Sequence, residues 1–431
     1  MKRWHIVLAA ACIVASGGAA GFFFWPASIE SVATSAAQPH GAALIARGEY
    51  LVKAADCAAC HTAPGGKPFA GGFAFKLPFG RLYSPNITPD KDTGIGGWTD
   101  AEFVRALHQG IGRDGEDLYP AFPYTSYALL STDDALAIRA YLQTLPPARA
   151  KPPENSILFP FNQRFVMRAW KLLFLPKHRF EANPARDPVW NRGAYLAEAL
   201  AHCGECHTPR NLMFATKSDA KFAGAVVDGW KAYNITPDPQ SGIGKWTDAE
   251  LADYLATGHA EGHGGASGNM AEAVDLSLRH LSRADIESIV TYLKTVPPQR
   301  SGDPEIVQAD PPSLAVSTAW SVPPGQPASE GRRIFESACA SCHGWNGEGQ
   351  QSQYAALRGA RTVNDPDGTN LVRVVLEGVR IRSRLGDMTM PAFAQAYSDA
   401  EIASLSNYVL EQFGAKQGRV TATMVARART K

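Results

Sequence analysis

Six of the seven cysteines occur in three copies of a five-residue pattern, Cys-x-x-Cys-His. This pattern is the attachment site of c-type haem, because two thiols add to the haem vinyl groups and the adjacent histidine reaches the iron. The copies are Cys57–His61, Cys203–His207 and Cys339–His343. We therefore predict three covalently bound haem c groups. The cysteines that would bind them are Cys57, Cys60, Cys203, Cys206, Cys339 and Cys342, and the proximal iron ligands would be His61, His207 and His343.

Two other chemistries also use paired cysteines. A zinc cluster combines two Cys-x-x-Cys pairs, so an odd number of pairs fits it poorly. A redox dithiol of the thioredoxin type needs a βαβ context, and the sequence shows no such pattern. The seventh cysteine, Cys12, lies in an apolar N-terminal run and has no partner there. Haem attachment is therefore the preferred interpretation.

A methionine follows the third motif at a distance that suits the sixth iron ligand. Met390 lies well after His343 in the chain and directly precedes Pro391. A thioether sulfur is a soft ligand for haem iron, and Met/His ligation raises the reduction potential. We predict Met390 as this ligand, with Met388 as its competitor.

The second motif has a similar candidate in Met270, which follows both His207 and Trp246 in the chain. Met213 comes only six positions after His207, too few to reach the far face of the haem. We therefore predict Met270 as the sixth ligand. The histidines that could replace it, and that we expect instead at the surface or beside haem propionates, are His259, His263 and His280.

The first motif has no methionine in this register. The interval from Trp246 to Met270, counted instead from Trp98, gives Phe122, whose side chain has no lone pair for iron. The only methionine between the first and second motifs is Met167. We predict that Met167 is the sixth ligand of the first haem. The alternatives are His108 and an open or water-bound iron.

Composition excludes some classes of protein. The chain has 431 residues, with 42 Lys and Arg against 41 Asp and Glu, and a net charge of +1. A dedicated nucleic-acid binder would need a basic surplus, so no nucleic-acid partner is expected. Because 45% of the residues are hydrophobic and 19% are charged, long disorder is not expected either.

The N-terminus has the pattern of an export segment. Lys2 and Arg3 precede a long run without charge, Ile6–Trp25. About 20 apolar residues can span a bilayer, and the basic flank keeps the N-terminus in the cytoplasm. A cleaved signal, with a small-residue site such as 31–33, is the other interpretation. Both place the remaining chain on the periplasmic side of the bacterial inner membrane.

The segments around the first two motifs repeat each other. The block Asn86–Asp90 recurs as Asn234–Asp238, and Gly94–Asp100 recurs as Gly242–Asp248. The third segment lacks the first block but ends on a similar predicted helix, Glu401–Gln412. We therefore expect the first two haem segments to pack as a pseudo-symmetric pair and the third to be separable.

Helix signals support an all-α fold with three tandem haem domains, in which a C-terminal helix crosses an N-terminal helix. Ser/Thr-x-x-Glu capping boxes open apolar-periodic stretches, and strand patterning is sparse. The boxes pair Thr99 with Glu102, Thr247 with Glu250, and Ser398 with Glu401. The predicted boundaries are 1–27 for the signal or membrane anchor, 41–149 for the first domain, 150–187 for an aromatic helical connector, 188–298 for the second domain, 299–324 for a proline-rich linker, 325–414 for the third domain and 415–431 for a basic tail.

Two of these segments carry more than one interpretation. In the connector, residues 160–175 are aromatic and apolar with interleaved cations. They predict either a core helix between domains or a helix that lies on a membrane or a partner. The tail has five cations and no acid. It predicts either contact with anionic lipid or a solvated or partner-docking segment.

The chain resembles the tri-haem cytochrome c subunit of bacterial membrane-bound dehydrogenase complexes over nearly all of residues 45–415. The resemblance rests on the three motifs, the Asn-Ile-Thr-Pro-Asp blocks, Gly204–Asn211 and Met390–Phe393. It implies three class I cytochrome c-like domains and a large dehydrogenase partner of quinoprotein, flavoprotein or molybdenum type. It also implies electron delivery to ubiquinone or a terminal oxidase. Leu118–Tyr124 lacks the methionine of the alcohol dehydrogenase branch and is more similar to subunits that serve molybdenum hydroxylases.

The residues alone point to the same class of function. No Ser–His–Asp order, phosphate loop or dinucleotide fingerprint is visible. A haem iron with both axial positions filled has nowhere to bind substrate, so it transfers electrons without catalysing a reaction on substrate. The competing hypothesis is an autonomous multihaem oxidoreductase, peroxidase-like, that uses an open first haem.

Overall fold

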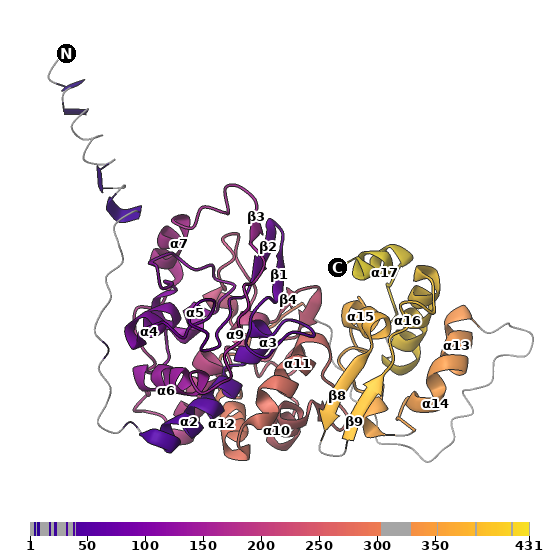
Figure 1. The fold of residues 1–431 in the computed structure, drawn as a ribbon. Helices are drawn as coiled ribbons and strands as arrows, with labels where there is room; N and C mark the ends of the chain where they lie inside the picture. Colours follow the sequence, from indigo (N-terminus) through magenta and orange to yellow (C-terminus); the bar gives the residue numbers. More distant parts are fainter. Residues whose placement is uncertain are drawn as a thin grey trace, which may run out of the picture. The chain divides into compact units, whose positions relative to one another are not determined.

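The structure is a computed structural model that describes residues 40–302, 329–350, 352–383, 386–414 and 417–430, with isolated positions before residue 40. The chain divides into two units (Figure 1). The first unit comprises Met1–Asn183 and Glu198–His202, and the second comprises Pro184–Ala197 and Cys203–Lys431. The first haem motif therefore lies in the first unit, and the other two motifs lie together in the second.

This division corrects the expected pairing of haem segments. The second segment joins the third in one unit instead of the first, because residues far apart in sequence bond across it. Lys231 forms an ion pair with Asp365, with 3.0 Å between Nζ and Oδ2. The side chain of Asn370 accepts from the Lys231 N–H and donates to its carbonyl oxygen, at 2.8 and 2.9 Å.

An N-terminal helix meets a C-terminal helix in each haem segment, as the sequence predicts (Figure 1). The pairs are α2 (Gly41–Ala54) with α6 (Thr132–Leu142), α8 (Pro188–Tyr195) with α12 (Arg283–Leu293), and α13 (Glu330–Ile334) with α16 (Asp399–Gly414).

A glycine makes each of these close approaches possible. A Cβ built on Gly48 would lie 1.9 Å from the Ala137 carbonyl oxygen, and one on Gly193 would lie 1.8 Å from that of Ser288. At Gly331 the same construction meets the Ser404 carbonyl oxygen at 2.1 Å. No larger residue fits at these positions without separating the two helices. The three crossings are therefore built alike.

Capping boxes begin the predicted helices. Thr99 and Glu102 exchange side-chain and backbone hydrogen bonds at the start of α4 (Asp100–Gln109). The same reciprocal bonds begin α10 (Asp248–Thr257) and α16. These hydrogen bonds confirm the predicted helix starts. The sequence can predict a capping box because the box depends on residues only three positions apart.

Short antiparallel strands accompany the helices and depart from a purely helical expectation. The longest register joins β8 to β9, from Val379↔Met390 to Ser383↔Gly386. The strands are β1 (Ala74–Leu77), β2 (Gly80–Tyr83), β3 (Ser156–Ile157), β4 (Ala225–Val227), β5 (Trp230–Ala232), β6 (His259–Ala260), β7 (Gly264–Gly265), β8 (Val379–Ser383) and β9 (Gly386–Met390).

The remaining helices are mostly short. A π-helical stretch precedes the second motif at Leu196–Leu200, and another runs into the first cysteine of the third motif at Phe335–Cys339. The α-helices are α3 (Cys57–His61), α5 (Tyr124–Tyr127), α7 (Val166–Phe174), α9 (Gly204–His207), α11 (Gly268–Leu276), α14 (Ala340–His343), α15 (Thr369–Glu377) and α17 (Ala422–Arg429), and the 3-10 turns are Ser218–Ala220, Leu278–His280 and Gln353–Ala355.

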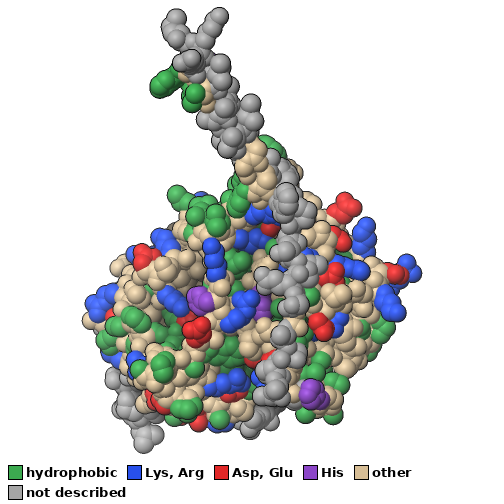
Figure 2. All heavy atoms as spheres, turned by 90° about the vertical axis from the view of Figure 1, so that its left-hand side faces the viewer, with side chains coloured by type: hydrophobic (Ala, Val, Ile, Leu, Met, Phe, Trp, Pro, Cys, Tyr) green, Lys and Arg blue, Asp and Glu red, His purple; other side chains and the backbone are tan. Residues whose placement is uncertain are grey.

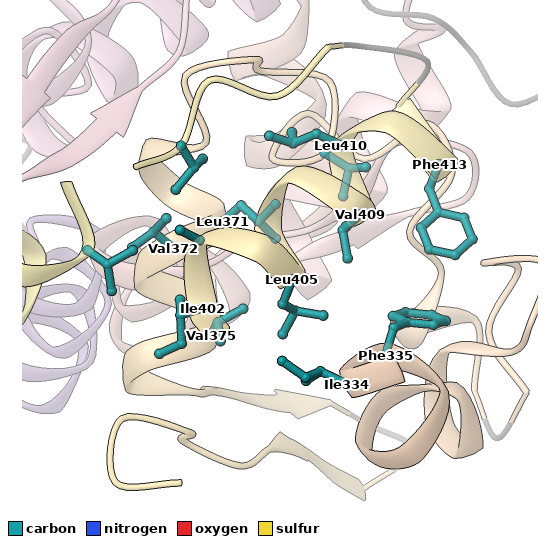
Figure 3. Close-up of a cluster of buried hydrophobic side chains, with 14 of the residues drawn as sticks. Ile334, Phe335, Leu371, Val372, Val375, Ile402, Leu405, Val409, Leu410 and Phe413 are labelled. Carbon is teal, nitrogen blue, oxygen red and sulfur yellow. The ribbon is translucent and has the colours of Figure 1, made fainter. Parts of the chain in front are cut away.

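The core of the third segment is built largely from side chains of α15 and α16. Ile334 and Phe335 point toward side chains of α15 and α16 (Figure 3). Ile402 and Leu410 of α16 are fully buried at its centre. The cluster joins the start of the segment to its end, which makes the segment a packed body.

The basic tail does not project as a free solvated segment. Val425 of α17 is fully buried and belongs to the third core. Arg429 forms an ion pair with Asp399 in the first turn of α16, at 2.6 Å. Residues 417–430 therefore pack in part against the third segment, while Arg419 and Arg427 stay exposed.

Other boundary predictions fall largely outside the described residues. Of the proline-rich linker 299–324, only residues 299–302 are described, and of the N-terminal segment 1–27 only scattered positions are. Among the residues that the structure describes, no helix combines the length and the apolar character that a membrane span requires. The connector 150–187 is helical only in α7, and its residues Ser156 and Ile157 instead extend the β1–β2 hairpin.

Candidate haem-binding sites

Each Cys-x-x-Cys-His motif forms a single helical turn with its histidine at the end. The turns are α3, α9 and α14, with the first cysteine of the second and third motifs just before the turn. Residues three apart in a helix lie on the same side, so both thiols of a motif face one way. The structure therefore brings together the two cysteines and the histidine that the sequence predicts for each site.

The three motif histidines make the same hydrogen bond. Each Nδ1 lies close to a backbone carbonyl oxygen, and an N–H at that nitrogen donates to it. The distances are 2.8 Å from His61 to Pro85, 2.6 Å from His207 to Tyr233, and 2.6 Å from His343 to Ala355. This bond places the lone pair on Nε2, which is the arrangement that an iron-ligating imidazole needs.

The supporting carbonyls confirm the repeat between the first two segments. The separation of Tyr233 from Pro85 along the chain equals that of Trp246 from Trp98. Both carbonyls follow the second strand of a hairpin, β2 or β5. In the third segment the carbonyl comes from the 3-10 turn at Gln353–Ala355, a short distance after His343 in the chain. The same bond is thus made by a different loop.

Electrostatics at the motifs favours haem over a thiolate chemistry. Burial lowers the pKa of His61, His207 and His343, and the carbonyl hydrogen bonds oppose this only in part. A neutral imidazole is the form that binds iron. Burial raises the pKa of Cys57 to about 12 and that of Cys339 to about 11. Neither of these two thiols therefore has the low pKa of a reactive dithiol.

Helix α11 carries Met270 and packs against the strand that supports the second proximal histidine. Gly268 adopts φ +52°, and a Cβ there would lie 2.3 Å from the ring of Trp230. Trp230 begins β5, which leads directly to Tyr233. The candidate ligand is thereby tied to the loop that holds His207. Its ligation of iron stays a prediction.

Met390 ends β9, and both it and Cys339 pack against the third hydrophobic core. It pairs with Val379 across the β8–β9 hairpin, whereas Met388 pairs with Ile381. The prediction that Met390 ligates the third haem therefore has a structural basis but no direct test.

Phe122 lies near the first motif, where the register places a sixth ligand. Its ring is 5.5 Å from that of Tyr127, whose hydroxyl donates to the Ala55 carbonyl oxygen at 2.8 Å. Ala55 lies two residues before Cys57. The Phe122 ring is thus linked through Tyr127 to the backbone just before the first motif, and its place in the sequence register is that of Met270 in the second segment.

Helix α7 carries Met167, which is half-buried. Trp170, three residues later on the same face, has its ring 6.0 Å from that of Tyr124, and Tyr124 in turn lies 6.3 Å from Phe122. His108 at the end of α4 is the other candidate. Its Nε2 is buried without a hydrogen-bond partner among the described residues, and burial lowers its pKa to about 4.

Two of the histidines that the sequence suggested at the surface or beside haem propionates, His259 and His263, are buried. His263 stacks on Trp246 with 3.7 Å between ring centroids, and its Nε2 lies 3.4 Å from the Glu250 carboxylate. His259 lies 4.5 Å from the Tyr354 ring and contacts the Gln353 carbonyl oxygen at 3.1 Å. These contacts join distant loops, and no local pattern in the sequence could have predicted them.

Comparison with known proteins agrees with this geometry. A family model described as Cytochrome c matches residues 45–146 and 328–412. The chain is 40% identical over 405 residues to the fructose dehydrogenase cytochrome subunit of Gluconobacter japonicus, covering 89% of this chain and 82% of that protein. It is 36% identical to the gluconate 2-dehydrogenase cytochrome c subunit of Pantoea cypripedii, covering 90% of each.

A longer relative also matches. A nicotinate dehydrogenase subunit of Pseudomonas putida is 39% identical over 421 residues, which is 96% of this chain. The chain spans only 34% of that protein. The paired thiols and neutral imidazoles fit covalent haem c, and the two relatives of similar length are named as cytochrome subunits of dehydrogenases. The chain therefore belongs to the cytochrome c subunits of dehydrogenase complexes, a family of electron-transfer subunits that are not themselves catalytic.

Proposed function

We propose that the chain carries three haem c groups and passes electrons from a large dehydrogenase subunit to ubiquinone or a terminal oxidase. The observation that carries this proposal is the threefold arrangement of motif turn, histidine and supporting carbonyl. Haem c supplies reversible one-electron chemistry when it is bound. The protein's own residues attach it, orient the proximal imidazoles and exclude water.

The coarse function is tested with the native complex. The haems of the purified complex should become reduced when the dehydrogenase substrate is added, as seen in the absorption spectrum. The haems of the isolated chain should not respond to that substrate. Mass spectrometric identification of the large subunit decides between a quinoprotein, a flavoprotein and a molybdenum enzyme. Rapid turnover of hydrogen peroxide by the isolated chain would instead favour the autonomous oxidoreductase.

We also propose the periplasmic side of the inner membrane as the location. The support is the basic flank and the long uncharged run Ile6–Trp25, which exports the chain whether or not it is cleaved. Alkaline phosphatase fused after residue 40 should be active in intact cells, and inactivity of that fusion would contradict export.

Met167→Leu should lower the reduction potential of one haem and create one carbon-monoxide-binding site. The reason is that loss of a thioether ligand removes the factor that raises the potential and opens an axial position. Optical redox titration and carbon monoxide difference spectra measure both effects.

Two variants control this prediction. Met213→Leu changes a half-exposed methionine in the second segment and should leave every potential unchanged. Phe122→Met in the Met167→Leu background should restore a sixth ligand, because residue 122 occupies the register of Met270. If the parent protein already binds carbon monoxide at one haem, the first iron is open and Met167 is not its ligand. If His108→Phe alone reproduces the shift, His108 is the ligand.

Arg361→Gln should lower the reduction potential of one haem by removing a positive charge, with no change of iron ligand. The Arg361 guanidinium lies 4.9 Å from the ring of Tyr233, whose carbonyl oxygen supports His207. A nearby positive charge disfavours the more positive, oxidised iron, so its removal favours oxidation. Potentiometric titration measures the shift. Arg361→Lys keeps the charge and should keep the parent potential, and equal shifts in both variants would exclude an electrostatic cause.

A further inference from the structure

The connector between the first and second haem motifs exposes large apolar side chains. Helix α7 lies at the upper left in Figure 1, and Figure 2, which faces that side, shows hydrophobic side chains along its upper edge. An apolar area of this kind marks a surface that meets a protein or a membrane. The residues that we call the connector surface are Leu158, Phe159, Phe161, Val166, Leu172 and Leu173, each 43–78% exposed.

Helix α7 exposes several of its apolar residues. Trp170 and Lys171 are buried. Val166, Leu172 and Leu173 are 43%, 56% and 65% exposed. A helix beside water normally turns its polar residues outward and its apolar residues inward. The exposed apolar side chains of α7, together with the buried Lys171, therefore favour an apolar neighbour for this helix.

The connector surface is held firmly on the first unit. Lys171 Nζ lies 2.5 Å from Asp117 Oδ1 and donates to the carbonyl oxygens of Gln109 and Gly110. The Tyr119 hydroxyl donates to the Phe161 carbonyl oxygen at 2.9 Å. These buried polar bonds fix the orientation of the apolar face, so its exposure does not result from loose attachment.

The neighbouring residues point to lipid as the occupant. Phe22 and Phe23 belong to the uncharged N-terminal run, and they contact Arg168 of α7 and Phe165, which precedes it. The Phe23 ring lies 5.7 Å from that of Phe165, and Arg168 donates to the Phe22 carbonyl oxygen at 3.0 Å. Residues 155–180 also contain five Lys and Arg and no Asp or Glu, and of these Lys171 and Arg168 are paired with Asp117 whereas Lys177 is exposed. Apolar side chains beside an exposed cation match the boundary between acyl chains and anionic headgroups.

We infer that the connector surface lies in the headgroup region of a phospholipid bilayer, beside the N-terminal run. The inference rests on the membrane location proposed above. It adds a second lipid contact, made by the haem-bearing body of the protein itself. An exported protein with this contact would keep its first haem segment at the membrane surface even where the N-terminal run is cleaved.

The test places a photo-reactive amino acid on the connector surface of the full chain in bacterial membranes. Leu173 and Val226 are both 65% exposed, and Val226 in β4 lies outside the connector surface. p-Benzoylphenylalanine at position 173 should cross-link to phospholipid under ultraviolet light, and the same group at position 226 should not. Phe159, which is 78% exposed, provides a second labelling position should the first variant fold poorly.

Two results would overturn the inference. The first is a cross-link from position 173 to a polypeptide, which would make the connector surface a contact with the dehydrogenase subunit. The second is equal lipid labelling at positions 173 and 226. Haem content and reduction by the dehydrogenase substrate are measured on the same membranes. A failure of the electron-transfer function is thereby recorded separately from a failure of the lipid contact.

Discussion

The double variant Cys57→Ala/Cys60→Ala should bind two haems per chain where the parent binds three. Both thiols of α3 are removed, so neither thioether bond can form at the first motif, while the other two motifs are unchanged. A small domain buries much of its apolar surface against its haem, so the first unit should also lose stability. A pyridine haemochrome assay calibrated against protein concentration counts the haems.

The first motif offers a matched control. Ala59→Ser converts Cys57–His61 into the sequence of the third motif, Cys-Ala-Ser-Cys-His. Attachment depends on the two cysteines and the histidine, so this variant should keep all three haems. A parent protein with fewer than three haems would refute the three-haem proposal, and an unchanged count in the double variant would refute attachment at the first motif.

Asp117→Ala should reduce the free energy of unfolding of the first unit by about 3–5 kcal/mol, the usual cost of leaving one partner of a buried ion pair without its counter-charge. The side chains of Asp117 and Lys171 are 5% and 7% exposed. Arg168 also contacts this carboxylate, at 3.5 Å. Helix α7 should therefore detach first. Hydrogen exchange of the amides of residues 166–174 measures this opening locally.

Two comparisons separate charge from packing. The apolar double replacement Asp117→Leu/Lys171→Met should cost much less than Asp117→Ala, because no charge is left buried alone. The exposed ion pair between Arg283 and Asp253 provides the other comparison, since its side chains are 50% and 57% exposed. Asp253→Ala should change stability by less than about 1 kcal/mol. If Asp253→Ala and Asp117→Ala cost the same, burial of the ion pair is not what stabilises α7.

The connector surface is a region for which the sequence alone supports two interpretations. Residues 160–175 are apolar, aromatic and basic in sequence, and that composition suits a core helix as well as a lipid-facing one. Only the fold shows that Lys171 is buried and Leu173 exposed. The reason is that hydrophobic periodicity describes one face of a helix, whereas α7 has an apolar residue on each face and its partner decides which face is covered.

The sequence by itself determined the chemistry of the haem sites and the local form of the helices. A motif turn and a capping box each depend on a few neighbouring residues, so their signals survive in the linear chain. Thr99 with Glu102 is an example. The capping boxes form as predicted.

Only the tertiary structure decided which segments pack together and which loops support the motif histidines. The ion pair of Lys231 with Asp365 joins two haem segments that are far apart in the chain, and the burial of Val425 attaches the tail to the third core. The carbonyl partner of His343 comes from a loop unlike those of the first two segments. Contacts between distant residues leave no period or spacing in a sequence, because their energy depends on the shape of both surfaces after each has folded.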